Sequence, residues 1–359
     1  MTAPTALTAL DDRATVDRLD PHGLLGRIEA LPEQCEEAWR CAGEFELPSA
    51  YRDAREVVLL GMGGSAIAGD IVRSIASTSG RKPIYVVRGY DAPGFVSEQT
   101  LVVACSHSGN TEETLSSVRQ SLDAGARGIA VTTGGELRSL AGERGIHCLS
   151  YDYDGEPRSA IGHQLMTLLS LAERAGLLAS QGDAVAEAVS LMREQRARIG
   201  HSTSSDRNAA KQLAGRLRGK LPVIVGGGVL SDAAYRWKTQ INENAKSWAF
   251  HETMPELNHN AIAGFGLPEE LVPRLHVVFL HHSALHPRLR LHYDAAADAL
   301  TAAGVAHERV EALGSSGLAQ ALTSLHFGDL VSYYLALLNR VEPAPVQALD
   351  KVKAKLAQS

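Results

Sequence analysis

The sequence is poor in the features that mark a secreted, zinc-binding or membrane protein. Its 359 residues include 4 cysteines without CxxC spacing, which gives neither a disulfide framework nor a zinc knuckle. Aromatic residues are few, at 5%. No apolar run approaches the roughly 18 residues of a membrane span, and the N-terminus lacks the basic start and apolar core of a signal peptide. These absences predict a globular protein of the reducing cytoplasm that does not bind membranes.

An excess of positive charge is also missing. Lys plus Arg number 35 against 41 Asp plus Glu, a net charge of −6. This balance argues against nucleic acid or an anionic membrane as a partner. The length favours two domains of about 150 residues each. We expect a loosely ordered N-terminal extension over residues 1–20, a first domain over 21–180 and a second over 181–359.

The first half alternates short apolar strands with helical stretches, starting with helical spacing in Pro21–Ala42. Such alternation predicts a parallel sheet covered by helices on both faces. The expected strands are Glu56–Leu60, Pro83–Arg88, Leu101–Cys105, Gly128–Thr133 and His147–Tyr151.

The second half repeats this pattern in a weaker form. Helices expected at Ser159–Leu178 and Val185–Ile199 bridge the two halves. Leu221–Leu230 then repeats the strand and glycine turn, and His276–Leu289 repeats the strand, serine and helix. We interpret this as a degenerate duplication of one doubly wound α/β unit, followed by a final helix at Pro345–Ala357.

The stretch Thr100–Leu115 carries the strongest functional signal. Its buried strand ends at a cluster of hydroxyl and glycine residues, and Asn110 and Thr111 can cap the helix that follows. Ser106, Ser108 and Thr111 therefore surround a helix N-terminus, where backbone N–H groups favour an anion. Because this turn contains no Lys or Arg, it suits a phosphomonoester better than a nucleoside triphosphate. The second half lacks these hydroxyls, so we expect strong phosphate binding in the first half alone.

The glycine turn at Gly61–Ala66 allows a competing interpretation. It satisfies G-x-G-x-x-A after a strand, which is the dinucleotide fingerprint. The next strand ends at Arg88 rather than at an acidic residue, so NADP fits this pattern better than NAD. A second anion turn on a neighbouring strand argues against both, because one pyrophosphate does not need it.

Several motifs together resemble one known family. GMGGSA at Gly61–Ala66 and SHSGNTEE at Ser106–Glu113 are similar to a sugar isomerase (SIS) domain. With PRSA at Pro157–Ala160, NENAK at Asn242–Lys246, ELNHN at Glu256–Asn260 and the C-terminal lysine helix, the chain resembles the bifunctional phosphoglucose/phosphomannose isomerase family from about residue 20 onward. The resemblance implies two SIS domains and no metal or redox cofactor.

It further implies an aldose–ketose isomerase of glycolysis and gluconeogenesis. Such an enzyme interconverts fructose 6-phosphate with glucose 6-phosphate, mannose 6-phosphate or both, through an enediol. This reaction requires ring opening, a base for a carbon-bound proton and positive charge beside the oxyanion.

The resemblance also assigns roles to residues. Gly64 and Ser65 would line the sugar, Glu243 would move the proton between C1 and C2, and Arg158 would stabilise the enediolate. The serine and threonine hydroxyls that would hold the phosphate are Ser106, Ser108 and Thr111.

The remaining implied residues concern ring opening and assembly. His259 would assist ring opening from the partner subunit of a homodimer, together with Lys353. One departure is His107, where the family usually has tyrosine.

Each assignment has a structural alternative. Glu243 at i, i+3 from Lys246 could form a surface ion pair, although the flanking asparagines are poor residues for a helix interior. Three lysines in the final helix most often mark a solvated face. A phosphosugar-binding regulator without catalysis is the alternative function, and His281 and His282 lack the carboxylate or cysteine partners of a metal site.

Overall fold

The computed structural model describes residues 7–80 and 82–356 and divides the chain into two compact units. One unit comprises residues 30–190 with 316–319 and contains the first sheet. The other comprises 1–29, 191–315 and 320–359 and contains the second sheet. We call them the first-sheet unit and the second-sheet unit. The main boundaries, 29/30 and 190/191, lie about ten residues beyond the expected ones at 20/21 and 180/181. The segment before residue 30 belongs to the second-sheet unit.

The first-sheet unit contains five parallel strands in the order β2-β1-β3-β4-β5. The predicted strands are confirmed within one or two residues. They are β1 (Glu56–Leu60), β2 (Ile84–Val87), β3 (Thr100–Cys105), β4 (Arg127–Thr132) and β5 (His147–Ser150). All six residues of β3 are buried, so the strand that precedes the SHSGNT turn runs through the middle of the core.

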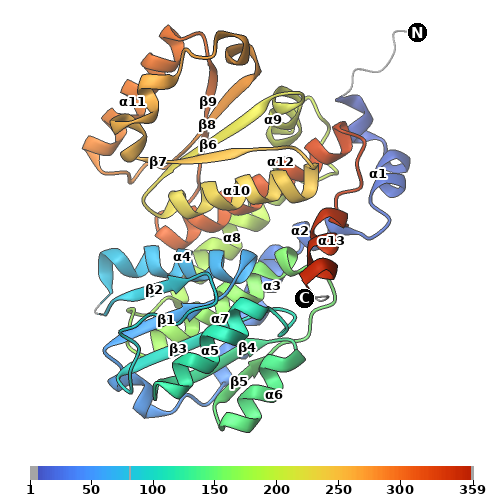
Figure 1. Cartoon of the computed structure of the whole chain (residues 1–359). Coiled ribbons are helices and arrows are strands. Elements are labelled where there is room, and N and C mark those ends of the chain that lie inside the picture. Colours follow the sequence, from blue (N-terminus) through green and yellow to red (C-terminus); the bar gives the residue numbers. More distant parts are fainter. Residues whose placement is uncertain (1–6, 81, 357–359) are drawn as a thin grey trace. The chain divides into compact units, whose positions relative to one another are not determined.

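Helices cover both faces of this sheet, as the alternation predicted. In Figure 1, α5 and α6 cover the face turned to the viewer, and their apolar residues pack with β1, β3 and β4. The helices of this part of the chain are α3 (Leu31–Glu44), α4 (Gly63–Ser79), α5 (Glu112–Asp123), α6 (Gly135–Arg144) and α7 (Ile161–Arg174). The stretch expected at Ser159–Leu178 is therefore the 3₁₀ turn η3 (Pro157–Ala160) followed by α7.

The second-sheet unit contains four parallel strands in the order β7-β6-β8-β9. Strands β6 (Leu221–Gly227) and β8 (Leu275–His281) were predicted, whereas β7 (Phe250–Met254) and β9 (Ala306–Glu311) were missed. The missed strands form the two edges of the sheet, and neither has the apolar run on which the prediction relied. The helices from the bridge onward are α8 (Gly182–Ile199), α9 (Ala209–Leu217), α10 (Val229–Ala245), α11 (Pro287–Ala302), α12 (Gly317–Leu338) and α13 (Gln347–Leu356).

The N-terminal segment is more ordered than expected. From Thr8 it forms η1 (Thr8–Asp11), α1 (Arg13–Leu19) and α2 (Leu24–Glu29), and residues 1–6 of the expected extension lie outside the described residues. Leu10 and Val16 are buried, and Asp11 accepts a hydrogen bond from the fully buried Lys211 ammonium at 2.8 Å. Apolar burial and this ion pair hold the segment in place, which its Thr- and Ala-rich composition did not reveal.

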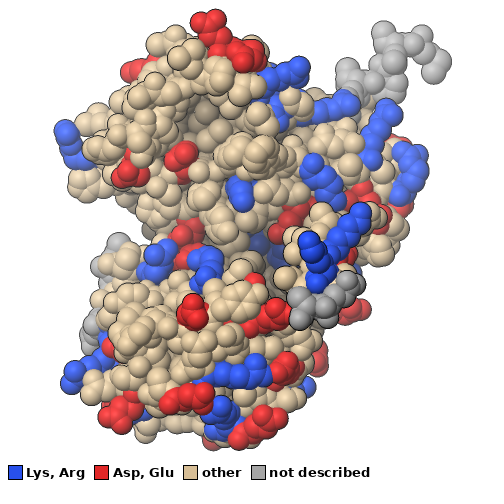
Figure 2. All heavy atoms as spheres, in the orientation of Figure 1, with Lys and Arg blue, Asp and Glu red and all other residues tan. Residues whose placement is uncertain are grey.

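Charged groups are interspersed over the described surface shown in Figure 2, where Lys and Arg alternate with Asp and Glu. Within the described ranges, every helix is too short or too polar to cross a membrane.

Candidate functional site

Two neighbouring turns at the carboxyl end of the first sheet hold most of the predicted phosphate and sugar residues. The turn after β1 leads directly into α4, which begins at Gly63, earlier than the predicted Ala66. Ser65 lies in the first turn of α4 and is buried. A Cβ on Gly61 would lie 3.0 Å from the Cys105 carbonyl oxygen at the end of β3. The absence of a side chain there lets the β1–α4 and β3–α5 turns pack against each other.

The turn after β3 brings its hydroxyl groups together. Ser106 Oγ and Thr111 Oγ1 lie 2.8 Å apart, and Ser106 Oγ accepts a hydrogen bond from the Gly109 N–H at 3.1 Å. Ser108 Oγ accepts from the Asn110 N–H at 3.2 Å. Ser106 is buried, Thr111 half-buried and Ser108 exposed. The three predicted phosphate ligands thus lie in one turn, with an exposed side open to a ligand.

The prediction that the Asn110 or Thr111 side chain caps α5 is wrong. Thr111 occupies the N-cap position, but its hydroxyl contacts Ser106 Oγ instead of capping the helix. The Asn110 side chain accepts from the Glu136 N–H at 2.9 Å, outside α5. The first-turn N–H groups of α5 are therefore left to bind an anion, where the helix dipole adds a partial positive charge of about +0.5.

A third turn, Thr132–Glu136, packs against the turn after β3, Ser106–Thr111, in which phosphate binding was predicted (the phosphate turn). The sequence analysis missed this third turn. Thr133 donates to the His107 carbonyl oxygen through its N–H at 3.1 Å and its hydroxyl at 2.7 Å. The Leu137 N–H donates to the Gly109 carbonyl oxygen at 2.9 Å. Gly109 has φ +71°, and a Cβ there would lie 1.9 Å from the Gly134 carbonyl oxygen. The two turns are locked together by backbone contacts, and the TTGGE sequence after the fourth strand was the available signal.

Arg158 is placed beside the glycine turn. It is buried in η3, at 8% exposure, where a charged side chain needs polar partners. A Cβ on Gly64 would lie 3.4 Å from the Pro157 carbonyl oxygen and 3.7 Å from Arg158 Cα. The turn is fixed by Gln34 of α3, which donates to the Ser159 carbonyl oxygen at 3.0 Å. The structure therefore brings Gly64 and Arg158 together.

A cluster of aromatic rings lies against the phosphate turn. His107 Nδ1 lies 3.2 Å from the Tyr151 hydroxyl, and the His163 ring stacks on Tyr151 with centroids 5.0 Å apart. Gln164 Nε2 donates to the same hydroxyl at 3.4 Å. Burial lowers the pKa of both His107 and His163, so both imidazoles are neutral near pH 7. His107, which departs from the family pattern, thus links the phosphate turn to α7.

Arg88 does not favour the dinucleotide interpretation. Its guanidinium forms a two-pronged ion pair with the Asp70 carboxylate of α4. A ribose 2′-phosphate would have to displace that carboxylate.

The second-sheet unit carries Glu243, half-buried in the last turn of α10. Its neighbours fix the end of this helix: Asn242 Oδ1 accepts from the Ala249 N–H at 2.9 Å, and Asn244 Nδ2 donates to Ser332 Oγ at 2.9 Å. Lys246 Nζ donates to the backbone carbonyl oxygens of Glu243 and Pro343, at 2.5 and 3.0 Å. The asparagines and the lysine thus rigidify the backbone that carries Glu243.

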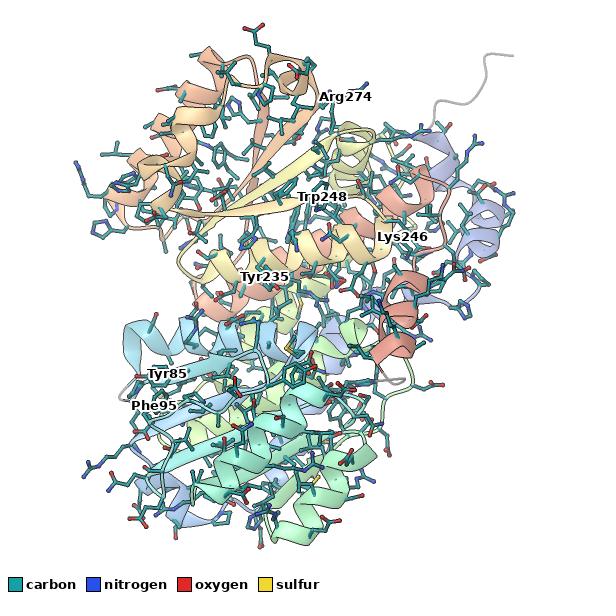
Figure 3. The ribbon with its side chains drawn as sticks, in the orientation of Figure 1. Tyr85, Phe95, Tyr235, Lys246, Trp248 and Arg274 are labelled. Atoms are coloured by element: carbon teal, nitrogen blue, oxygen red, sulfur yellow. The ribbon has the colours of Figure 1, made fainter. Side chains whose placement is uncertain are left out.

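A groove of about 670 Å³ lies beside this helix end and includes Asn242, Lys246 and Trp248 in its lining. Figure 3 labels Lys246 and Trp248 there, and the Trp248 side chain is 69% exposed.

The predicted ring-opening residues also lie in the second-sheet unit. His259 is exposed at the end of η4 (Glu256–His259), and Lys353 is exposed on α13. The six predicted phosphate, sugar and enediolate residues lie in the first-sheet unit, whereas Glu243, His259 and Lys353 lie in the other. Among the described residues, no group of three or more His, Cys, Asp or Glu side chains could hold a metal ion.

Two parallel α/β sheets covered by helices give the chain the fold of the SIS class of proteins. Solved structures agree on the fold. A hypothetical protein from Thermus thermophilus matches 98% of the chain and 94% of its own with a TM-score of 0.74 at 18% identity. A glucose-6-phosphate isomerase-like protein from the same organism matches 96% and 98% with a TM-score of 0.62 at 19% identity.

Sequence comparisons give the family. Residues 206–356 match the bacterial phospho-glucose isomerase C-terminal SIS domain. The bifunctional phosphoglucose/phosphomannose isomerase of Caldicellulosiruptor bescii is 36% identical over 91% of this chain and 97% of its own. That of Aquifex aeolicus is 32% identical over 87% and 95%. The chain belongs to the bifunctional phosphoglucose/phosphomannose isomerase family.

Proposed function

We propose that this protein is an aldose–ketose isomerase that interconverts fructose 6-phosphate with both glucose 6-phosphate and mannose 6-phosphate through an enediol. The observation that carries the proposal is the family membership, since full-length relatives are named for both activities. The phosphate turn in the first-sheet unit supports it, because its hydroxyls and free α5 amides suit a phosphomonoester.

The phosphate end of the sugar is assigned to the first-sheet unit. Ser106, Ser108 and Thr111 accept or donate hydrogen bonds at the phosphate oxygens, and Gly64 and Ser65 line the sugar. The proximity of Gly64 to Arg158 supports placing the guanidinium beside the enediolate oxygen, where it stabilises the developing negative charge.

Glu243 is assigned as the base. It removes the proton from C2 of the aldose and returns it to C1 of the enediol. The hydroxyl proton of O2 passes to O1, so that O1 becomes a hydroxyl, C2 becomes the carbonyl carbon and Glu243 ends in its starting protonation state. The rigid backbone around it supports this role, because a base must be held within hydrogen-bond reach of the carbon-bound proton. Rotation about C2–C3 in the enediol presents either face of C2, so one base serves both epimers.

The test is an assay in D₂O with fructose 6-phosphate. Wild-type protein should yield glucose and mannose 6-phosphates carrying deuterium at C2. Glu243→Gln should lower kcat by about 10²–10⁴-fold, the typical contribution of a general base, while a matched Glu252→Gln variant on β7 should retain activity. Binding of the sugar without deuterium exchange in the wild-type protein would identify a regulator instead of an enzyme.

We further propose that the enzyme acts as a homodimer in which His259 and Lys353 assist ring opening in the partner's site. The exposure of both side chains supports this. So does the exposure of large apolar residues in the same unit, with Trp248, Leu267 and Leu291 at 69, 74 and 56%.

Mixing two inactive variants tests the shared site. If His259 acts across the interface, heterodimers of Glu243→Gln and His259→Ala subunits contain one intact site, so refolded equimolar mixtures should recover about a quarter of wild-type activity. If His259 serves its own subunit, every site is defective and the mixture stays inactive.

The cytoplasm is the proposed location. Its support is that Cys35, Cys41, Cys105 and Cys148 are all free thiols.

A further inference from the structure

A second histidine, His292, lies beside His259 and has no role in the proposed reaction so far. His292 is half-buried on α11, and its ring centroid lies 6.3 Å from that of His259. The planes are inclined by 39°. At this separation both imidazoles can contact one small polar ligand.

Asn258, the residue before His259, fixes the protonation of this second ring. Asn258 Nδ2 lies 2.9 Å from the His292 carbonyl oxygen and 3.0 Å from His292 Nδ1. A carbonyl oxygen can only accept a hydrogen bond, so the amide NH₂ group must face this pair of atoms. Its second hydrogen then points at Nδ1, which must present a lone pair.

The reverse orientation of the amide is unfavourable. It would place the Asn258 oxygen against the His292 carbonyl oxygen and lose both hydrogen bonds. Asn258 Oδ1 is buried and has no hydrogen-bond partner among the described residues, so the reversed NH₂ group would gain none in its place. The orientation that satisfies His292 is thus the one the structure adopts.

The consequence is a single tautomer. With Nδ1 accepting, the proton of the neutral ring resides on Nε2. An N–H group on Nδ1 would face the amide NH₂ group, so the tautomer with its proton on Nδ1 is disfavoured. His292 therefore offers its Nε2–H group as a hydrogen-bond donor.

We propose that His292 is a substrate-binding residue of the ring-opening site, a tautomer-locked donor whose Nε2–H binds a ring or hydroxyl oxygen of the hexose phosphate. His259 then exchanges the proton during ring opening, while His292 donates its hydrogen bond to the sugar. This inference rests on the proposed function and gives the two adjacent histidines different roles, proton exchange for His259 and hydrogen-bond donation for His292.

Ring opening can be measured apart from isomerisation. In a Glu243→Gln background the carbon-bound proton is not transferred, but opening and closing of the ring still interconvert the α and β anomers of glucose 6-phosphate. NMR exchange between the anomers reports that rate. In this background, adding His292→Phe should slow the enzyme-catalysed exchange about tenfold, the effect of losing one hydrogen bond.

Two further variants separate hydrogen bonding from packing. His292→Gln keeps an N–H donor and should recover most of the exchange rate, which a purely structural role would not predict. His307→Phe on β9 is the matched control and should leave exchange at the parent rate. Equal losses in the Phe and Gln variants, or none in either, would overturn the inference.

The tautomer has its own spectroscopic signature. ¹⁵N–¹H correlation spectra of the wild-type protein should show the His292 ring proton on Nε2 in the neutral form. Asn258→Asp, nearly isosteric, supplies an acceptor at Nδ1 and should place a proton on Nδ1. A wild-type ring protonated on Nδ1 would contradict the inference. Failure of the proposed function would instead appear as wild-type protein that does not isomerise fructose 6-phosphate.

Discussion

The two sheets are built on the same plan but end in turns of different chemistry. In the first-sheet unit, β3 leads into Ser106 and Thr111, whose hydroxyls contact each other and leave the first turn of α5 uncapped. In the second-sheet unit, β8 leads into His282, and the N-terminus of α11 is capped by the His286 ring, which accepts from the Arg288 N–H at 3.2 Å. Pro287 in the first turn of α11 has no N–H to offer.

This difference shows that the same fold can place turns of different chemistry at equivalent positions. Both units place a helix N-terminus after a central parallel strand. Of the two turns compared, the β3–α5 turn combines hydroxyl groups with a helix start that no side chain caps, whereas the His286 ring caps the helix in the β8–α11 turn. Function is carried by a few side chains grafted on a repeated scaffold.

The largest difference in stability between the two units should appear when a glycine in each unit is replaced by alanine. Gly109→Ala forces a Cβ to within 1.9 Å of the Gly134 carbonyl oxygen at φ +71°. We expect loss of measurable activity and a free energy of unfolding lower by several kcal/mol (roughly 3 or more), from strain and overpacking together.

The control is Gly228→Ala in the turn after β6. Gly228 has φ +59°, but a Cβ there would enter open space. With φ +59° and ψ −135°, the cost should be about 1–3 kcal/mol from backbone strain alone. Thermal unfolding of both variants measures the contrast, and equal destabilisation would show that the two turns are not packed differently.

Removing one hydroxyl should have an intermediate effect. Ser106→Ala takes away a group that would contact the charged phosphate, which costs about 1.5–3 kcal/mol, or roughly 10–100-fold in KM. Because phosphate binding is the same in the ground state and the transition state, kcat should change little. Ser283→Ala after β8 should leave both constants unchanged. A raised KM in Ser283→Ala would mean that the second turn also binds phosphate.

The smallest effect concerns pH. Burial lowers the pKa of His163 below its unfolded value of about 6.5, so the stability that depends on the neutral ring is present above that pH and is lost as pH falls. The difference in melting temperature between wild type and His163→Gln should shrink between pH 7 and 5.

Glu308 in the second-sheet unit responds in a lower window. Burial raises its pKa, but hydrogen bonds from His276 and Arg216 outweigh this and lower it to about 2. Its contribution is present above the unfolded value of about 4.3 and is lost between there and 2. The difference between wild type and Glu308→Gln should therefore hold from pH 7 to 5 and fall below that. If both variants lost their stability difference from wild type over the same pH range, the assigned directions of the two pKa shifts would be contradicted.

The features readable in the sequence are those with strong local signals. The apolar run before Ser106 and the glycines after Leu60 correctly predicted two strands, each followed by a turn into a helix. The turn at Thr132–Glu136 was missed because its hydrogen bonds go mainly to backbone carbonyl oxygens of the phosphate turn, more than 20 residues earlier in the sequence. Asp11 was missed because its side chain contacts Lys211, 200 residues further along the chain.

Roles within a motif were harder to derive. Thr111 was expected to cap α5, yet its hydroxyl contacts Ser106, because Gly109 turns the chain so that the two side chains meet. Asn258 was visible only as part of ELNHN, and its hold on His292 depends on the packing of η4 against α11. Side-chain partners of this kind follow from tertiary structure, not from spacing.

The most direct test of the contrast between the turns is calorimetric titration of the Glu243→Gln protein, which binds sugar phosphate without converting it. We predict one glucose 6-phosphate per chain, with affinity that falls about 10–100-fold on adding Ser106→Ala and is unchanged on adding Ser283→Ala. Two sites per chain, or binding weakened by Ser283→Ala and not by Ser106→Ala, would contradict the assignment of phosphate to the β3–α5 turn.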